Sequence, residues 1–342
     1  MALGGTTHEK LPKALTDTAR LHAHRAIDNI GATAPLDLLD QAVSIGVSAE
    51  LLLKATLASI DFGLLRDRNA DYRTVLTLAG KPLDPTSPLP ELKTVGAKDA
   101  YRLLKQDLAP RLNVSTLKSV KLELLDQILA VRDSAVHMGF ACQEANERAL
   151  ADLVGVIELM LKIRAELGQD GDWECFWTND YRERADGILQ SRHAEIATAY
   201  GRTLSVARKT FAARWRVPGS ADAIQVLEQM EPFALIVERD QTTRPHTCPA
   251  CGSKGRALYD ISRGPVQIDD SDRPHSVAYF VELHGLPRAF HCAICDLRLD
   301  SPEDLELAAV NEIDLGETEA RDWEVDAAFG GPDEDRLEDW ED

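Results

Sequence analysis

The chain has 342 residues, of which 44% are hydrophobic and 28% charged, so it is long and apolar enough to bury a core without disulfide bridges. No stretch approaches about 18 uninterrupted apolar residues, the first residues contain no apolar signal region, and six cysteines are too few for a disulfide scaffold. We therefore expect a cytoplasmic protein with no membrane partner. The net charge of −19 does not exclude a nucleic-acid partner, because residues 299–342 alone carry 18 acidic and 2 basic side chains.

The first half of the chain is predicted to be a helical bundle. Apolar residues at helical spacing, with glycines that end helices, indicate helices at residues 12–30, 36–62, 97–108, 116–137 and 144–167. Residues 80–90 contain four prolines and are expected to form a loop. We assign residues 1–168 to this bundle, and we expect His22 and His24 on its first helix to be surface residues.

Residues 169–240 are predicted to be a connector that contains one long helix at 181–217. This helix carries eight basic and three acidic side chains. A solvated linking helix has such a composition, and contact with RNA is the alternative.

Two Cys-x-x-Cys pairs indicate a metal site in residues 241–300. Each pair can place two thiolates on one turn, and the two turns together make a tetrahedral site from Cys248, Cys251, Cys292 and Cys295. Because four thiolates leave no open position for water, we predict one structural zinc per chain, in a small β zinc ribbon. Two redox pairs, or plain buried cysteines, are the alternatives, but no thioredoxin-like pattern surrounds either pair. Cys142 and Cys175 stand alone and are expected in the core.

The acidic residues 301–342 are predicted to be a largely disordered tail, because such a composition buries little apolar surface. The tail is expected to aid solubility. A sharper hypothesis is that it competes with RNA for a basic groove. The ribbon or the tail is also a candidate contact for a regulatory protein or trigger.

Arg132 stands on an otherwise apolar line of the predicted helix 116–137, together with Leu122, Leu125, Leu129 and Val136. An arginine there indicates an exposed edge, a buried ion pair or an interface. His137 follows five positions later, about 140° around an ideal helix. The two side chains can therefore meet only if the helix end distorts, which Gly139 would permit, or if a second subunit completes the site.

This segment resembles the HEPN superfamily of four- to five-helix bundles. Many members are ribonucleases with an Arg, a polar residue and a His after four to six intervening residues, which here are Arg132, Asp133 and His137. The stretch SAELLLKATLA is similar to the family's second long helix, with Glu50 and Lys54 one turn apart as supporting residues. The resemblance covers roughly residues 10–168. It implies a mainly α protein: a HEPN-like bundle, to which the long connecting helix, the small zinc ribbon and the acidic tail are added.

The resemblance also implies an endoribonuclease that needs no metal for catalysis. The RNA 2′-OH is the nucleophile, His137 would transfer its proton, Arg132 would hold the scissile phosphate and Asp133 would orient either side chain. HEPN sites usually form at a two-fold face, so a homodimer through the bundle is implied, and many members are toxins or antiphage effectors. One alternative is a catalytically silent module that binds nucleic acid or protein, in which Arg132 is an ion-pair partner and His137 a helix-end cation. The other is a toxin that stays silent until it is triggered.

Overall fold

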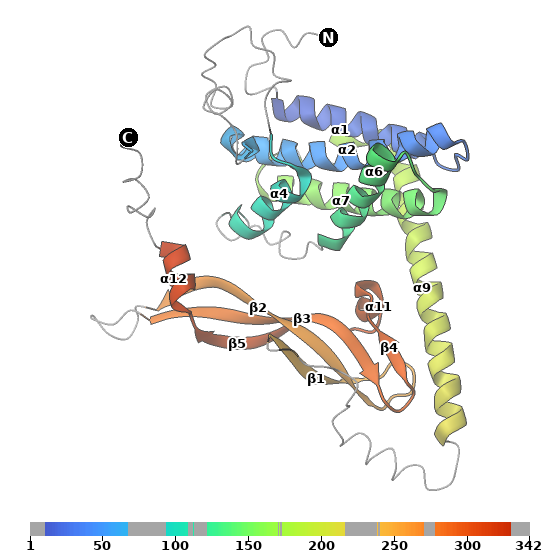
Figure 1. Cartoon of the computed structure of the whole chain (residues 1–342), viewed down its shortest axis with the longest axis vertical. Coiled ribbons are helices and arrows are strands. Elements are labelled where there is room, and N and C mark those ends of the chain that lie inside the picture. The colour runs from blue at the N-terminus through green and yellow to red at the C-terminus, as the bar shows by residue number, and fades with distance from the viewer. Residues whose placement is uncertain are drawn as a thin grey trace. The chain divides into compact units, whose positions relative to one another are not determined.

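The structure is a computed structural model that describes residues 11–67, 94–108, 112, 122–169, 171, 173–215, 238, 240–269 and 278–329. It divides into two compact units, Met1–His193 and Ala194–Asp342. The described residues are mainly helical and include a five-stranded antiparallel sheet (Figure 1). The predicted mainly α class is therefore confirmed, while our finer division of the chain into four parts stays a prediction.

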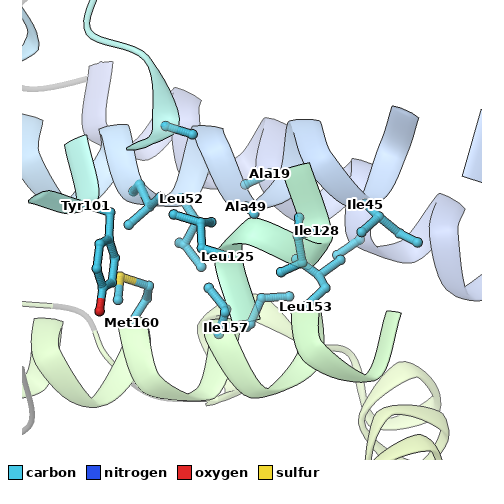
Figure 2. Close-up of a cluster of buried hydrophobic side chains, with 14 of the residues drawn as sticks. Ala19, Ile45, Ala49, Leu52, Tyr101, Leu125, Ile128, Leu153, Ile157 and Met160 are labelled. Carbon is cyan, nitrogen blue, oxygen red and sulfur yellow. The ribbon is translucent and has the colours of Figure 1, made fainter. Parts of the chain in front are cut away.

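The first unit consists of helices that pack around α2. Its helices are α1 (Leu11–Asp28), α2 (Pro35–Ile60), the short η2 (Phe62–Leu65), α4 (Ala97–Arg102) with its continuation η4 (Leu103–Leu108), α6 (Leu122–Met138), α7 (Gln143–Glu166) and α8 (Trp173–Phe176). Helix α2 contacts α1, α4, α6 and α7, and the buried side chains between them form one apolar core (Figure 2). The predicted helices are all found, although residues 113–121 and the predicted loop 80–90 lie outside the described residues.

Backbone signals and buried hydrogen bonds fix the ends and pairing of these helices. Pro35 begins α2, and Gly139 (φ +61°) follows the last residue of α6 in the left-handed conformation that ends helices. Within the core, Ser48 Oγ donates a hydrogen bond to the Ala19 carbonyl and Gln41 Nε2 donates to the Ala26 carbonyl. These bonds satisfy polar groups that would otherwise be buried without partners, and they set the register of α1 on α2.

Helix α2 is long and apolar enough to cross a membrane by length and composition. Our expectation of no membrane span relied on uninterrupted apolar runs. That criterion does not detect α2, because polar residues interrupt its apolar sequence. Of its most apolar window, 61% is buried among the other helices. The core helix of a soluble protein has the same properties, so this helix is weak evidence for a membrane span.

Two expectations for single residues are wrong. The His24 ring is half-buried and stacks on the Tyr181 ring, with centroids 3.7 Å apart, and also on Trp177; His22 is half-buried too. Their spacing of two placed them on different faces, but α1 is covered on more than one side. Cys142 is exposed rather than in the core, because it lies at the N-cap of α7 directly after the turn at Gly139. The side chain of Cys175 lies outside the described residues.

Helix α9 (Asn179–Trp215) contains the boundary between the two units. Its first part joins the core of the first unit, where Arg184 binds the Asp28 carboxylate and the Ile27 carbonyl. Its last part joins the core of the second unit, where Arg208 donates to the Pro249 carbonyl. Several of the basic side chains that suggested RNA contact therefore bind the protein itself.

The second unit is built on an antiparallel sheet. The strands are β1 (Gln241–Thr247), β2 (Lys254–Asp269), β3 (Ala278–Cys292) and β4 (Leu297–Leu299) in spatial order, and β5 (Ile313–Glu319) also pairs with β3. The short helices α11 (Pro302–Leu307) and α12 (Asp322–Phe329) follow β4 and β5, respectively.

The prediction of a largely disordered segment 301–342 is wrong as far as Phe329, because α11, β5 and α12 occupy this stretch. Leu305, Ala308 and Val310 are buried in the core of the second unit, and β5 pairs antiparallel with β3, with one register shift between Leu283 and His284. The high acidic content led us to overlook these few apolar residues. They are enough to order the segment because they pack on a sheet that the preceding strands already form. Residues 330–342 lie outside the described residues.

Candidate functional site

Arg132 lies on the side of α6 that faces α2, and two carboxylates hold its guanidinium. Its Nη1 donates to Glu50 Oε2 at 2.6 Å, and its Nε and Nη2 donate to Asp133 Oδ1 at 3.0 and 2.9 Å. The side chain is 25% exposed, so the guanidinium is partly accessible to solvent. A guanidinium has five N–H groups, and in the described structure three of them are used, which leaves two for an anion.

Glu50 and Lys54 are more than a surface ion pair. Lys54 Nζ donates to Glu50 Oε1 at 2.6 Å and to Thr94 Oγ1 at 3.0 Å. The backbone of Thr94 is fixed in turn by a bridge to Arg66. The predicted contact between Glu50 and Lys54 thus belongs to a chain of bonds that runs from Thr94 through α2 to Arg132.

His137 is exposed and lies apart from this network. Helix α6 stays regular through Met138, so the helix end does not distort in the way that would bring His137 onto Arg132. No hydrogen bond or ion pair connects the two side chains among the described residues. The distorted helix end that the sequence left open as a route to a common site is therefore not found in α6.

The residues next to His137 in the sequence are apolar and exposed. Val136, Met138 and Phe140 are 57%, 78% and 62% exposed, although all three are large and apolar. We call these three residues the apolar collar. Singly exposed apolar residues are common, and three within five positions make the end of α6 unusually apolar for an exposed segment.

Sequence reasoning missed two residues of the network, Gly46 and Thr94. Gly46 lies inside α2, where a glycine is unfavourable, and the Arg132 side chain passes directly over it. A glycine inside an otherwise strong helix was the available signal, because it often marks a close approach. No local signal identifies Thr94, since its role depends on the path of the chain after residues 68–93.

The four cysteines of the two pairs come together in the second unit. Their sulfur atoms all lie within 4.8 Å of one another, with Cys248 Sγ 3.5 Å from Cys295 Sγ and Cys251 Sγ 3.6 Å from Cys292 Sγ. All four are free thiols rather than disulfides. The two turns that carry them are similar: Gly252 in one and Asp296 in the other adopt positive φ angles, +77° and +58°.

The electrostatics of the cysteine cluster suit a cation. Hydrogen bonds from Cys292 and Cys295 lower the pKa of Cys248, and its thiolate in turn raises the pKa values of Cys292 and Cys295 above those of ordinary thiols. Four thiolates this close can be ionised together only if a positive charge lies among them. The cluster could therefore hold a metal ion, as the spacing of the cysteines predicted.

Comparisons with known proteins add nothing to this description: no protein-family model, no curated protein and no solved structure matches the chain.

Proposed function

We propose that the chain is a HEPN-type endoribonuclease that cleaves RNA by attack of its own 2′-OH, with Arg132 and His137 as catalytic residues. The observation that carries the proposal is the Arg132 guanidinium, which is held at the surface of the first unit with two N–H groups free for a phosphate. Arg132 would bind the non-bridging oxygens of the scissile phosphate and offset the charge that develops there.

His137 supplies the proton transfer. Its imidazole takes the proton from the 2′-OH, the 2′-oxygen attacks phosphorus, and the bond to the 5′-oxygen breaks as that oxygen accepts a proton from water. The products are a 2′,3′-cyclic phosphate and a 5′-OH. The reaction uses no metal ion, because RNA carries its own nucleophile.

A homodimer fits this arrangement, because Arg132 and His137 of one chain do not meet. We propose that a second copy covers the apolar collar, which is exposed in the single chain, and supplies its His137 to the Arg132 of the first. The network around Arg132 and the exposed His137 would then be the two halves of one composite site.

Purified full-length chain tests the proposal directly. The wild type should cut single-stranded RNA and leave 2′,3′-cyclic phosphate ends, while Arg132→Ala and His137→Ala should lose at least about 100-fold in rate. His193→Ala is the matched control, because His193 is another exposed histidine of the same unit. Equal cleavage by all four proteins, or ends of another kind, would contradict the assignment.

A role as a toxin or antiphage effector belongs to the same proposal. RNA in cells that express the wild type should be fragmented, and RNA in cells that express His137→Ala should stay intact. A toxin that awaits a trigger, through the second unit or the acidic end, would be silent in both until that trigger is present.

One observation favours a second candidate, a catalytically silent module that binds nucleic acid or protein. Glu50 and Asp133 already balance the charge of Arg132, as in a purely structural ion pair. This candidate predicts no cleavage by the wild type under any condition. It also predicts that Arg132→Ala destabilises the first unit.

We propose in addition that the ion held by the four cysteines is one structural zinc per chain. The all-thiolate donor set, the pairs of cysteines on two similar turns and the burial of three of the four support zinc.

A further inference from the structure

Gly46 lies where the Arg132 side chain crosses α2. A Cβ atom at position 46 would lie 2.5 Å from Arg132 Cβ, 2.7 Å from its Cγ and 2.6 Å from its Cδ. These atoms form the root of the arginine side chain, so a change of rotamer at its far end cannot relieve the clash. To restore a normal carbon–carbon contact of about 3.5 Å, α6 would have to move by roughly 1 Å.

Gly46 belongs to a stripe on α2 that reaches the whole Arg132 network. Residues 46, 50 and 54 are spaced four apart and therefore lie on one face of the helix. The stem of Arg132 packs on Gly46, its guanidinium binds Glu50 one turn further along, and Lys54 binds the other oxygen of the same carboxylate. Thr94 lies outside α2 and joins the network by accepting a hydrogen bond from Lys54.

The charges of this network are balanced. Arg132 and Lys54 offset Glu50 and Asp133, so the four side chains together are neutral. Without Lys54 the group would carry a net negative charge and would repel a phosphate. Lys54 therefore allows Glu50 to hold the guanidinium without making the surroundings of Arg132 acidic.

We infer that Gly46 and Thr94 are positioning residues that act with the already expected supporting residues Glu50 and Lys54 to fix the Arg132 guanidinium in one place. Gly46 sets the separation of α2 and α6, and Glu50 binds the guanidinium from α2 while Asp133 binds it from α6. Lys54 holds the Glu50 carboxylate, and Thr94 accepts a hydrogen bond from Lys54. The further statement that this guanidinium binds an RNA phosphate rests on the proposed function. The positioning itself does not, and it can be measured without any RNA.

The side-chain Nε–H signal of Arg132 in a ¹⁵N–¹H spectrum of the full-length protein reports the positioning. Arg132→Lys assigns the signal, because it removes that signal alone. In the wild type the Nε–H donates to Asp133 and should give one resolved signal. Gly46→Ala should shift it or broaden it beyond detection. Gly155→Ala is the matched control, because Gly155 is a glycine of α7 whose added Cβ would meet nothing within 4 Å.

Glu50→Gln provides a second variant that adds no atoms to the packed interface. It removes the charge that binds the guanidinium, so the Arg132 signal should again shift or vanish while the backbone spectrum stays that of the wild type. If Gly46→Ala fails to fold, Glu50→Gln decides. An unchanged Arg132 signal in Glu50→Gln, or in a folded Gly46→Ala, overturns the inference.

RNA cleavage then separates the inference from the proposed function. If both hold, Gly46→Ala and Glu50→Gln should lose about 100-fold in kcat, the effect of misplacing a catalytic group by about 1 Å, while Gly155→Ala keeps the wild-type rate. If the Arg132 signal responds as expected but the wild type cleaves no RNA, the positioning stands and the nuclease assignment fails. If the wild type cleaves RNA and Glu50→Gln leaves the signal unchanged, the nuclease stands and the positioning fails.

Discussion

Glu324 is a buried carboxylate that attaches α12 to the sheet of the second unit. Arg263 Nε and Nη2 donate to its two oxygens at 2.6 and 2.9 Å, and the Arg321 backbone N–H donates to Oε2 at 2.7 Å. The hydrogen bonds from Arg263 lower the pKa of Glu324 below its ordinary value of 4.5. A carboxyl group with a depressed pKa in the folded state stabilises the fold above its unfolded pKa, and this contribution is lost as the pH falls through the folded pKa.

Glu324→Gln should therefore lower the free energy of unfolding by about 1–3 kcal/mol at neutral pH, because a charge-assisted pair becomes a neutral contact. Urea denaturation at a series of pH values measures the effect. The difference from the wild type should shrink as the pH falls below 4.5 and vanish once Glu324 is protonated. Glu317→Gln, an exposed carboxylate on β5, is the control and should show no such difference.

His24 gives the first unit a pH dependence of its own. Burial lowers the pKa of His24 below its ordinary value of 6.5; Arg20 and Arg184 lower it further, and Asp28 partly opposes them. Because the folded state favours the neutral imidazole, stability is complete above pH 6.5 and decreases as the pH falls toward the folded pKa. His24→Phe keeps a ring against Tyr181 without a titrating group, so it should lose less stability than the wild type between about pH 7 and pH 5. Melting temperatures across this range test it, with His193→Phe as the control.

At the scale of elements, the two cysteine turns connect the sheet to the end of α9. Trp215 Nε1 donates to the Ile294 carbonyl at 2.8 Å, inside the second turn, and Trp215 packs on the same core as Cys248 and Cys295. A metal held by the cysteines would therefore fix both turns and this helix end together. Its removal should loosen the second unit while the helical core of the first unit persists.

Metal content and fluorescence measure this prediction. The purified chain should contain one zinc, and Cys248→Ser should contain none, because three thiolates no longer make a closed site. Chelation or Cys248→Ser should expose Trp215 to solvent and shift its emission to the red, a change that is absent in Trp215→Phe. Cys142→Ser, at an exposed free cysteine, should keep both the metal and the emission. A protein that keeps its fluorescence after complete metal loss would contradict a structural role.

At the scale of the whole molecule, the sequence predicted what depends on local pattern and missed what depends on distant partners. Helical spacing located α2, α6 and α7, and cysteine spacing located the metal cluster, because each signal lies within a few turns of chain. Order in residues 301–329 was missed because it needs the sheet that β5 joins. Gly46 and Thr94 were missed for a related reason. Gly46 contacts Arg132, which is 86 positions away, and Thr94 binds Lys54, which is 40 positions away, and no local pattern reveals contacts at such separations.

The separation of Arg132 and His137 on one helix leads to a prediction about two chains. If one site takes Arg132 from one chain and His137 from another, Arg132→Ala and His137→Ala proteins should complement each other when they are unfolded and refolded together. Random pairing gives roughly half mixed dimers, each with one of its two sites intact, so up to about a quarter of the wild-type activity should return. Mixing either variant with the Arg132→Ala/His137→Ala double variant should restore no activity. Met138→Asp in the apolar collar should reduce the molecular mass in solution to that of a monomer and abolish the complementation. Cleavage by a monomer, or the absence of complementation between variants that do form dimers, would show that each chain assembles its site by itself.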